Sequence, residues 1–290
     1  MTNTVKSFKD KWNNNPTILF KETLDENSEI FKWLINRNGF KDGEEFRRYL
    51  SNKKRILDAG CGNGRVTALL EQYSNKDSEI IGIDIASADV AKDNLSSFTN
   101  VKIFQKDLMG DLKDLGKFDF IYCQEVLHHT KSPEKSFGNL CKILLPGGEI
   151  AIYVYKKKAP VREYVDDFIR EKISEMSYED AIKICDQITE LGKKLSEMNV
   201  KIQVPNVDIL EIKEGEYDLQ RFVYYFFMKC FWNKDYSFQE NSVINYDWYH
   251  PQLCSRHTID EVENWFLKEG LEITHKYVDF YGITIKGIKK

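Results

Sequence analysis

The sequence lacks the features that would place it outside ordinary intracellular globular proteins. Its six cysteines are scattered without a CxxC pair, and its five histidines show no metal-ligand spacing, which predicts reduced thiols and no metal site. No apolar run approaches the roughly 18 residues of a membrane helix, and the N-terminus has no apolar segment typical of a signal peptide. We therefore expect a cytoplasmic protein without a membrane span.

The charge balance is nearly even, with 42 Lys plus Arg against 46 Asp plus Glu and a net charge of −4. Such a surface gives no general attraction to phosphate backbones, so nucleic acid is disfavoured as a partner. The 290 residues, 42% of them apolar, are enough for one large domain or for a core with an insertion. Intrinsic disorder of the whole chain is excluded.

Short apolar runs alternate with helical patterns in the first half of the chain and again at its end. Val66, Leu69, Leu70 and Tyr73 share one face of a helix. This alternation predicts an α/β fold: a Rossmann-like, mostly parallel, seven-stranded sheet with helices on both faces. The expected strands are 56–59, 79–85, 101–105, 118–123 and 149–155, closed by a pair at 271–277 and 282–288.

Helix boundary signals accompany this pattern. Ser132 and Pro133 open a helix for which Gly147 is the expected stop. Thr258 and Glu261 form a capping box for a later helix, which Gly270 ends.

Residues 156–254 break the alternation with helical and aromatic-rich sequence. One predicted helix has an apolar stripe, and a second begins at the motif SYED. We expect four parts: an N-terminal helical cap (1–50), the core (51–155), a helical insertion that serves as a substrate lid (156–254) and core completion (255–290). The stripes are Val161, Tyr164, Val165, Phe168, Ile169 and Ile173, and then Ala181, Ile184, Ile188, Leu191 and Leu195.

Polar residues and glycines follow the expected strands, at the sheet edge where open α/β folds bind ligands. Gly60, Gly62 and Gly64 allow a sharp turn and close approach of the backbone to a ligand. Asp84 is placed to accept hydrogen bonds from ribose hydroxyls, and Asp107 follows the third strand. A nucleoside ligand is indicated, but the glycine spacing departs from G-x-G-x-x-G, so NAD or FAD is the weaker interpretation.

These motifs together resemble the class I S-adenosylmethionine (SAM) dependent methyltransferases, in particular the ubiquinone-methyltransferase-like group. The resemblance covers residues 51–155 and rests on DAGCGNG, GIDI, KDL, FDFIYCQEVLHH and LPGGE. It implies SAM as cofactor and S-adenosylhomocysteine as product. The insertion, with QRFVYY and DWYHP, also resembles a bacterial group of such enzymes, which favours a sugar or small-molecule acceptor.

The resemblance also implies residue roles. Asp58, Gly60 and Gly62 would hold the methionine part with Gln124 beside it, and Asp84 the ribose. Asp107 and Leu108 would contact the adenine. Asn63 and Ile85 complete the expected cofactor set.

The acceptor side is less defined by the sequence. His129, just past the fourth strand, is the first candidate for a base that takes a hydroxyl proton, and Asp247 and His250 are the second choice. Residues 245–251 read either as a binding loop over the sheet edge or as an aromatic anchor for the insertion. The candidate acceptor contacts are Glu125, Tyr249 and Arg221.

We therefore expect a methyltransferase that acts on an oxygen of a small molecule or sugar, as a monomer or homodimer. The alternatives are a SAM-binding partner protein without turnover and an enzyme that uses SAM for a different group transfer. The sequence lacks the N-P-P-Y and Pro-Cys motifs of enzymes that methylate nucleic-acid bases.

Overall fold

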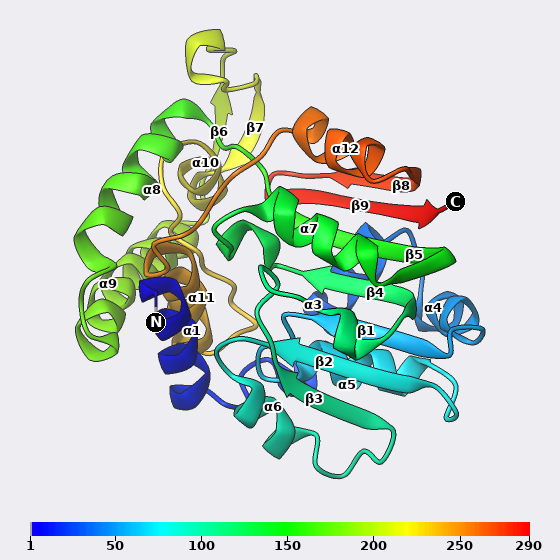
Figure 1. Cartoon of the computed structure of the whole chain (residues 1–290). Helices are drawn as coiled ribbons and strands as arrows, with labels where there is room; N and C mark the ends of the chain where they lie inside the picture. The colour runs from blue at the N-terminus through cyan, green and yellow to red at the C-terminus, as the bar shows by residue number, and fades with distance from the viewer. Residues whose placement is uncertain (1) are drawn as a thin grey trace. The chain divides into compact units, whose positions relative to one another are not determined.

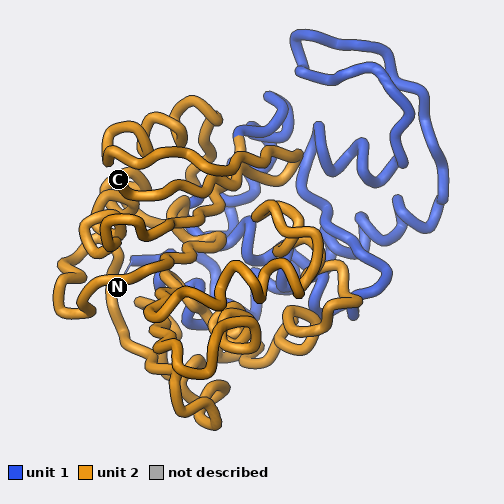
Figure 2. The backbone as a smooth tube through the Cα atoms, turned by 90° about the vertical axis from the view of Figure 1, so that its right-hand side faces the viewer, with its two compact units in different colours: residues 1–11, 157–254 blue, residues 12–156, 255–290 orange. Residues whose placement is uncertain are grey.

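The structure is a computed structural model that describes residues 2–290. The chain divides into two compact units, each drawn in its own colour in Figure 2. Unit 1 comprises residues 1–11 and 157–254, and unit 2 comprises residues 12–156 and 255–290. Helix α1 (Asn3–Asn14) runs across the first of these boundaries.

Unit 2 is built on a sheet for which residues 2–290 provide seven strands, in the order β3-β2-β1-β4-β5-β9-β8 (Figure 1). The first five strands are parallel, whereas β9 runs antiparallel to both of its neighbours. The predicted fold class is confirmed. The strands are β1 (Arg55–Ala59), β2 (Glu79–Asp84), β3 (Val101–Gln105), β4 (Phe118–Gln124), β5 (Leu144–Tyr155), β8 (Leu271–Val278) and β9 (Gly282–Lys289).

Successive side chains of β4 point to opposite faces of the sheet, and each face has its own helices. Phe120 contacts Tyr49 of α4, whereas Ile121 shares the main core with Phe137 of α7 and Phe266 of α12 (Figure 1). The helices are α2 (Phe20–Leu24), α3 (Glu29–Arg37), α4 (Gly43–Leu50), α5 (Arg65–Tyr73), α6 (Ala88–Asn94), α7 (Pro133–Lys142) and α12 (Ile259–Lys268), with short 3-10 turns η1 (Lys113–Leu115) and η2 (Leu127–His129).

The helix caps at Ser132 and Thr258 form as predicted, and the Thr258–Glu261 capping box is present. The predicted stop at Gly147 is wrong, because α7 already ends at Lys142. Gly147 has φ +74° and lies in the first part of β5, where a left-handed backbone position suits an irregular strand start.

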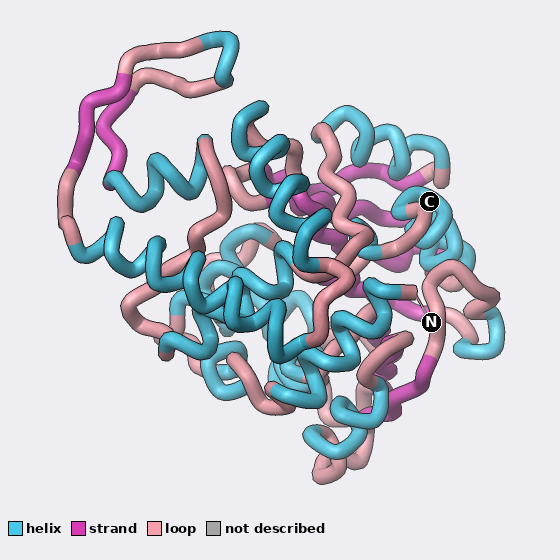
Figure 3. The backbone as a smooth tube through the Cα atoms, turned by 90° about the vertical axis from the view of Figure 1, so that its left-hand side faces the viewer, coloured by secondary structure: helices cyan, strands magenta, loops and turns pink. Residues whose placement is uncertain are grey.

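Unit 1 consists of helices and a two-stranded antiparallel sheet that extends away from them (Figure 3). The inner side of this hairpin packs on α10 through apolar residues that include Ile212 and Phe226. Its elements are α8 (Pro160–Ile173), α9 (Tyr178–Glu197), β6 (Lys201–Val204), the 3-10 turn η3 (Asp208–Leu210), β7 (Gly215–Asp218), α10 (Leu219–Phe226) and α11 (Phe238–Tyr249).

The buried face of α8 is charged. Arg162, Asp166 and Arg170 are buried, whereas Tyr164 and Phe168 are 76% and 53% exposed. The predicted apolar stripe is therefore wrong at Tyr164 and Phe168, whereas Ile173 is buried. Its other members, Val161, Val165 and Ile169, are half-buried. Asp166 accepts hydrogen bonds from Arg162, the Trp248 indole and the Tyr249 hydroxyl, which explains how a carboxylate is tolerated there.

Helix α9 follows its prediction more closely. Ser177 caps it, and Ala181 and Ile188 are buried. Leu191, predicted to be in the stripe, is 43% exposed, and Cys185 and Gly192 lie on the buried face instead.

None of the helices formed by residues 2–290 combines the length and the apolar character needed to cross a membrane. All six cysteines are buried free thiols, in agreement with the prediction of reduced thiols.

Candidate functional site

Hydrogen bonds hold the loops after β1, β2 and β3 together at one edge of the sheet. The backbone N–H of Gly62 donates to Asp84 Oδ2 at 3.0 Å, and Ser87 Oγ donates to the Gly62 carbonyl at 3.0 Å. The Lys106 N–H donates to the Asp84 carbonyl at 3.1 Å. This edge includes the ends of the neighbouring strands β1 and β4, between which the strand order reverses and where α/β folds bind ligands.

The glycine loop requires glycine at two positions. Gly60 and Gly62 have φ of +89° and +56°. A Cβ on Gly60 would lie 2.3 Å from a Val126 methyl group, which shows that the loop after β4 packs directly on the glycine loop. A Cβ on Gly62 would lie 2.8 Å from the ring of Trp12. Trp12, which is buried, therefore packs against the loop.

Asp58, at the end of β1, is a carboxyl group held mostly out of water. It is 1% exposed and accepts a 2.6 Å hydrogen bond from Thr67 Oγ1. Burial raises the pKa of Asp58 to about 7, although the Thr67 hydrogen bond acts in the opposite direction. Such a group gains from a cation placed beside it, since a positive charge restores the ionised form.

Asp84 holds the backbone of two loops. Its Oδ1 accepts from the N–H groups of Ala86 and Ser87 at 2.7 and 2.9 Å and lies 3.1 Å from Ser87 Oγ, while Oδ2 accepts from Gly62. A carboxylate oxygen has two lone pairs, so Oδ2 retains one acceptor position. Asp84 can thus bind a ribose hydroxyl while it also fixes the glycine loop.

Gln124, the last residue of β4, is buried with its amide nitrogen unpaired. Its side chain is 7% exposed, and Nε2 has no hydrogen-bond partner among residues 2–290. Leaving a buried donor unsatisfied costs about 1–3 kcal/mol. This donor is therefore suited to a ligand atom.

Arg37 is a second buried donor that the sequence analysis missed. Its guanidinium lies 3.5 Å from the centre of the Trp33 ring and 4.1 Å from that of Tyr153. It is 1% exposed, and apart from an interaction with the Tyr122 hydroxyl its three side-chain nitrogens have no hydrogen-bond partner within the described chain. Tyr153 pairs with Gln124 across β5 and β4, so both unpaired donors belong to the same part of the sheet.

The neighbour of Arg37, Asn38, fixes this corner. Its amide donates to the Leu34 carbonyl at 2.8 Å and to the Tyr122 hydroxyl at 2.9 Å. Burial raises the pKa of Tyr122, against the opposing charge of Arg37, so the phenol stays neutral. No signal in the sequence pointed to Arg37, because a single arginine at a helix end usually faces solvent.

The side chains of the remaining cofactor candidates differ in how accessible they are to a ligand. Ile85 is 38% exposed and Asp107 is exposed, whereas the side chain of Leu108 is part of the main core. The Asn63 amide donates to the carbonyls of Pro16 and Ile18 at 3.1 and 3.2 Å. Asn63 thus holds the N-terminal segment through both hydrogens of its amide nitrogen, so this nitrogen has no hydrogen left to donate to a ligand.

Two acceptor-side candidates lie just past β4. Glu125 has φ +59°, an uncommon conformation for a residue with a side chain, and its carboxylate is 3.7 Å from Arg65. His129 is half-buried in η2, with its ring 5.6 Å from that of Tyr155. His128 is fully buried and stacks on Tyr155 at 3.7 Å, which indicates a packing role.

The acceptor-side candidates in the insertion all belong to unit 1. Residues 245–249 are helical, because α11 continues to Tyr249, so the binding-loop alternative for residues 245–251 is wrong in conformation. Trp248 and Tyr249 are buried and bonded to Asp166 of α8, within the insertion itself. Asp247 pairs with Lys11 at 2.8 Å.

His250 has protein partners on both ring nitrogens. Nδ1 is 2.8 Å from the Tyr246 hydroxyl and 2.9 Å from Ser7 Oγ, and Nε2 is 3.1 Å from the Met176 carbonyl. Burial lowers the pKa of His250. These contacts favour a packing role over that of a base. Arg221 contacts the Trp232 carbonyl at 3.5 Å.

The residues of unit 2 fit an adenosyl amino acid. Asp84 offers an acceptor to the ribose, Asp58 favours a nearby cation, and the buried donors of Gln124 and Arg37 suit a carboxylate. In the described part of the chain, no cluster of three or more histidine, cysteine or acidic side chains could hold a metal ion.

The strand order, the glycine loop and the acid after β2 define a Rossmann-like protein of the class I SAM-dependent methyltransferase type. A model of the methyltransferase domain family matches residues 50–197, just over half of the chain. The chain belongs to this family, whose cofactor is SAM and whose product is S-adenosylhomocysteine.

Similar proteins of known name match about a third of the chain. A ubiquinone biosynthesis O-methyltransferase of Coxiella burnetii is 30% identical over 100 residues, 33% of this chain and 42% of that protein. A trans-aconitate 2-methyltransferase of Deinococcus radiodurans is 31% identical over 100 residues, 34% of this chain and 37% of that protein. The chain thus spans less than half the length of these relatives.

Solved structures agree in fold. PKMT2 from Rickettsia typhi has a TM-score of 0.55 at 16% identity, covering 86% of this chain and 52% of that one. A methyltransferase of Haloferax volcanii in complex with its Trm112 activator has a TM-score of 0.50 at 12% identity, covering 97% and 96%. At these identities the likeness concerns the fold alone.

Proposed function

We propose that this chain transfers the methyl group of SAM to an oxygen atom of a small-molecule or sugar acceptor. The observation that carries the proposal is the meeting of the glycine loop, Asp84 and the buried Gln124 donor at one sheet edge. The relatives named as O-methyltransferases support oxygen as the target.

Unit 2 would hold the cofactor through its own polar groups. Asp84 Oδ2 would accept from the ribose, and Asp107, which is exposed, from the adenine amine. The ionised Asp58 would neutralise the ammonium of the methionine part, while Gln124 and Arg37 would bind its carboxylate. SAM supplies an activated methyl group, so the protein mainly orients the two reactants and excludes water.

His129 would act as the base that accepts the hydroxyl proton. It is half-buried, it comes from η2 directly after β4, and its neighbour His128 is fixed by the Tyr155 stack. The carbonyl of His128 also accepts from the N–H and Oγ of Ser255 at 2.9 and 3.2 Å. These contacts hold the turn that carries His129 in one place, as a general base requires.

The insertion would contribute acceptor contacts. Among the expected residues, Arg221 suits this part best, because its Nη1 is buried and has no hydrogen-bond partner in the described chain. An acceptor with a phosphate or carboxylate would satisfy that donor.

The test is turnover in the presence of candidate acceptors. The protein is incubated with methyl-labelled SAM and a panel of hydroxylated metabolites and sugar nucleotides, and S-adenosylhomocysteine and labelled products are measured by mass spectrometry. We expect a product heavier than its acceptor by one methyl group. SAM binding without any product would favour the non-catalytic alternative, and a different mass increment would favour another group transfer.

His129→Gln is the matched variant for the base. We expect turnover to fall by about 100-fold or more while SAM affinity stays within about twofold, since general bases contribute roughly 10²–10⁴ in rate. Gln239→Glu, on the surface of α11, serves as a control and should keep full turnover. Full activity of His129→Gln would remove His129 from the proposed mechanism.

A further inference from the structure

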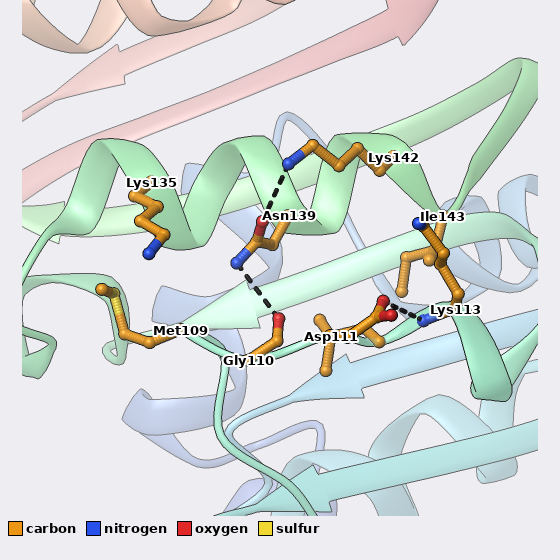
Figure 4. Close-up of a pocket in the computed structure, with 9 residues that line it drawn as sticks. Met109, Gly110, Asp111, Lys113, Lys135, Asn139, Lys142 and Ile143 are labelled. Carbon is orange, nitrogen blue, oxygen red and sulfur yellow. Dashed lines mark hydrogen bonds between the residues drawn. The ribbon is translucent and has the colours of Figure 1, made fainter.

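A pocket lies between α7 and the turn that follows β3, the turn that begins with the predicted adenine contacts Asp107 and Leu108. It has a volume of about 310 Å³ and is drawn in Figure 4. Its wall on one side is α7, and on the other side it is the backbone of residues 109–113. The pocket belongs entirely to unit 2.

Three lysines line this pocket. Lys135 and Lys142 come from the first and last turns of α7, and Lys113 reaches toward α7 from the opposite wall (Figure 4). Asp111 is the one acid among the lining residues. The pocket therefore carries a formal excess of two positive charges, although the whole chain carries a net charge of −4.

The nearby acids are already committed to other lysines. Glu134 pairs with Lys268 at 2.7 Å, and Asp114 pairs with Lys106. Within residues 2–290, none of the three pocket lysines forms an ion pair. Lys142 contacts the Asn139 amide oxygen at 3.1 Å, which is a neutral partner.

Like charges around one small pocket repel one another and favour occupancy by an anion. Lysine ammonium groups bind phosphate as point charges and need no fixed fork geometry. We propose that this pocket binds the phosphate groups of a small phosphorylated molecule.

The pocket is connected to the predicted adenine loop through Asn139. The Asn139 amide nitrogen donates to the carbonyls of Leu108 and Gly110 at 2.9 and 3.2 Å, and its oxygen accepts from Lys142. An anion that draws Lys142 away from Asn139 would loosen this link to the turn that begins at Asp107. Phosphate binding would thus alter SAM affinity, a consequence that rests on the proposed function, whereas the binding itself does not.

The test is calorimetric titration of the whole protein with inorganic diphosphate at low, constant ionic strength. We expect saturable binding of one diphosphate per chain that is about tenfold weaker in Lys135→Glu/Lys142→Glu. The matched control is Lys41→Glu/Lys76→Glu, which reverses two exposed lysines outside the pocket and should bind as the wild type does. Circular dichroism melts confirm that both variants are folded.

Two outcomes would overturn the proposal: no binding of diphosphate, whether or not heparin or anionic vesicles bind, and equal loss of binding in both variants. Binding of heparin or anionic vesicles without diphosphate would indicate an extended basic surface that binds a polyanion or a membrane. A wild type that binds diphosphate but fails to bind SAM would support the pocket and contradict the proposed function, so the two ideas fail separately.

Discussion

Asp166 of unit 1 and the pair Arg37 and Gln124 of unit 2 show two opposite ways in which this chain buries polar side chains. In unit 1, Asp166 is buried among donors that satisfy it, from Arg162, Trp248, Tyr249 and the Lys229 backbone. In unit 2, the side chains of Arg37 and Gln124 are buried with donors that the described chain does not satisfy. The first arrangement stabilises a fold, and the second is suited to a ligand, because an unsatisfied buried donor is retained at a cost in stability.

The largest expected effect is on the free energy of unfolding, and it tests Asp166, whose hydrogen bonds are satisfied. Asp166→Ala should lower the free energy of unfolding by about 3–5 kcal/mol, since it leaves buried Arg162 without its carboxylate. Thermal unfolding and limited proteolysis of residues 157–254 measure the loss. Asp167→Ala, at a neighbouring side chain that is 54% exposed, is the control and should cost much less. Equal effects would mean that Asp166 is not the anchor of unit 1.

A somewhat smaller effect is expected on the cofactor side. Asp84→Asn should weaken SAM binding by about 100-fold, because the ribose loses a charged acceptor and the Gly62 amide loses its partner. Calorimetry gives the dissociation constant. Asp89→Asn, at an exposed acid of α6, should leave it unchanged. Unaltered SAM affinity in Asp84→Asn would remove the ribose assignment.

Arg37→Met separates binding from stability. We expect SAM affinity to fall by about tenfold, while the stability of the free protein changes little. The loss of the contacts with the Trp33 and Tyr153 rings is offset by the removal of a buried charge that has no ion-pair partner among the described residues. Chemical denaturation and calorimetry report the two quantities. Arg47→Met, at an exposed arginine that lies on the Tyr73 ring, should change neither by much. A variant that loses stability but keeps its SAM affinity would make Arg37 a structural residue like Asp166.

The smallest effect is a pH dependence. In the free protein Asp58 takes up a proton as the pH falls through about 7, and the protonated form cannot pair with an ammonium. SAM affinity should therefore be constant above pH 7 and decrease below it, by at most about tenfold per pH unit. Asp58→Asn should abolish this slope. A flat profile in the wild type would show that Asp58 does not contact the charged part of the cofactor.

The same pKa has a consequence for folding. The folded state holds a proton on Asp58 at pH values where the unfolded chain, with an ordinary pKa of 3.8, has released it. The Asp58 contribution therefore favours folding at low pH and is lost as the pH rises from about 4 to about 7. In Asp58→Asn this part of the pH dependence of stability should disappear.

The sequence predicted the α/β unit well because its strands are buried on both faces and read as short apolar runs. The glycine loop and Asp84 could be found because their positions follow from strand ends. The charged face of α8 could not be found, since Asp166 receives its partners from Trp248 and Tyr249, 82 and 83 residues later in the chain. Periodicity alone assigned the apolar residues of α8 to the buried side.

Arg37 shows the same limit at the candidate site. Its burial depends on Tyr153 of β5, which only the fold brings over the end of α3. Leu108 differs from Arg37 in the opposite direction. The motif implied that Leu108 contacts the adenine, but its side chain lies in the main core. Motifs thus identified the loops, but not which side chains in them are free to bind.

A crystal structure of the protein with S-adenosylhomocysteine is the most direct test of the assignment of the cofactor to unit 2. We expect the ribose hydroxyls within hydrogen-bond distance of Asp84 Oδ2 and the amino-acid carboxylate near Gln124 Nε2 and the Arg37 guanidinium. A ligand bound elsewhere, with these two donors still unpaired, would contradict the account.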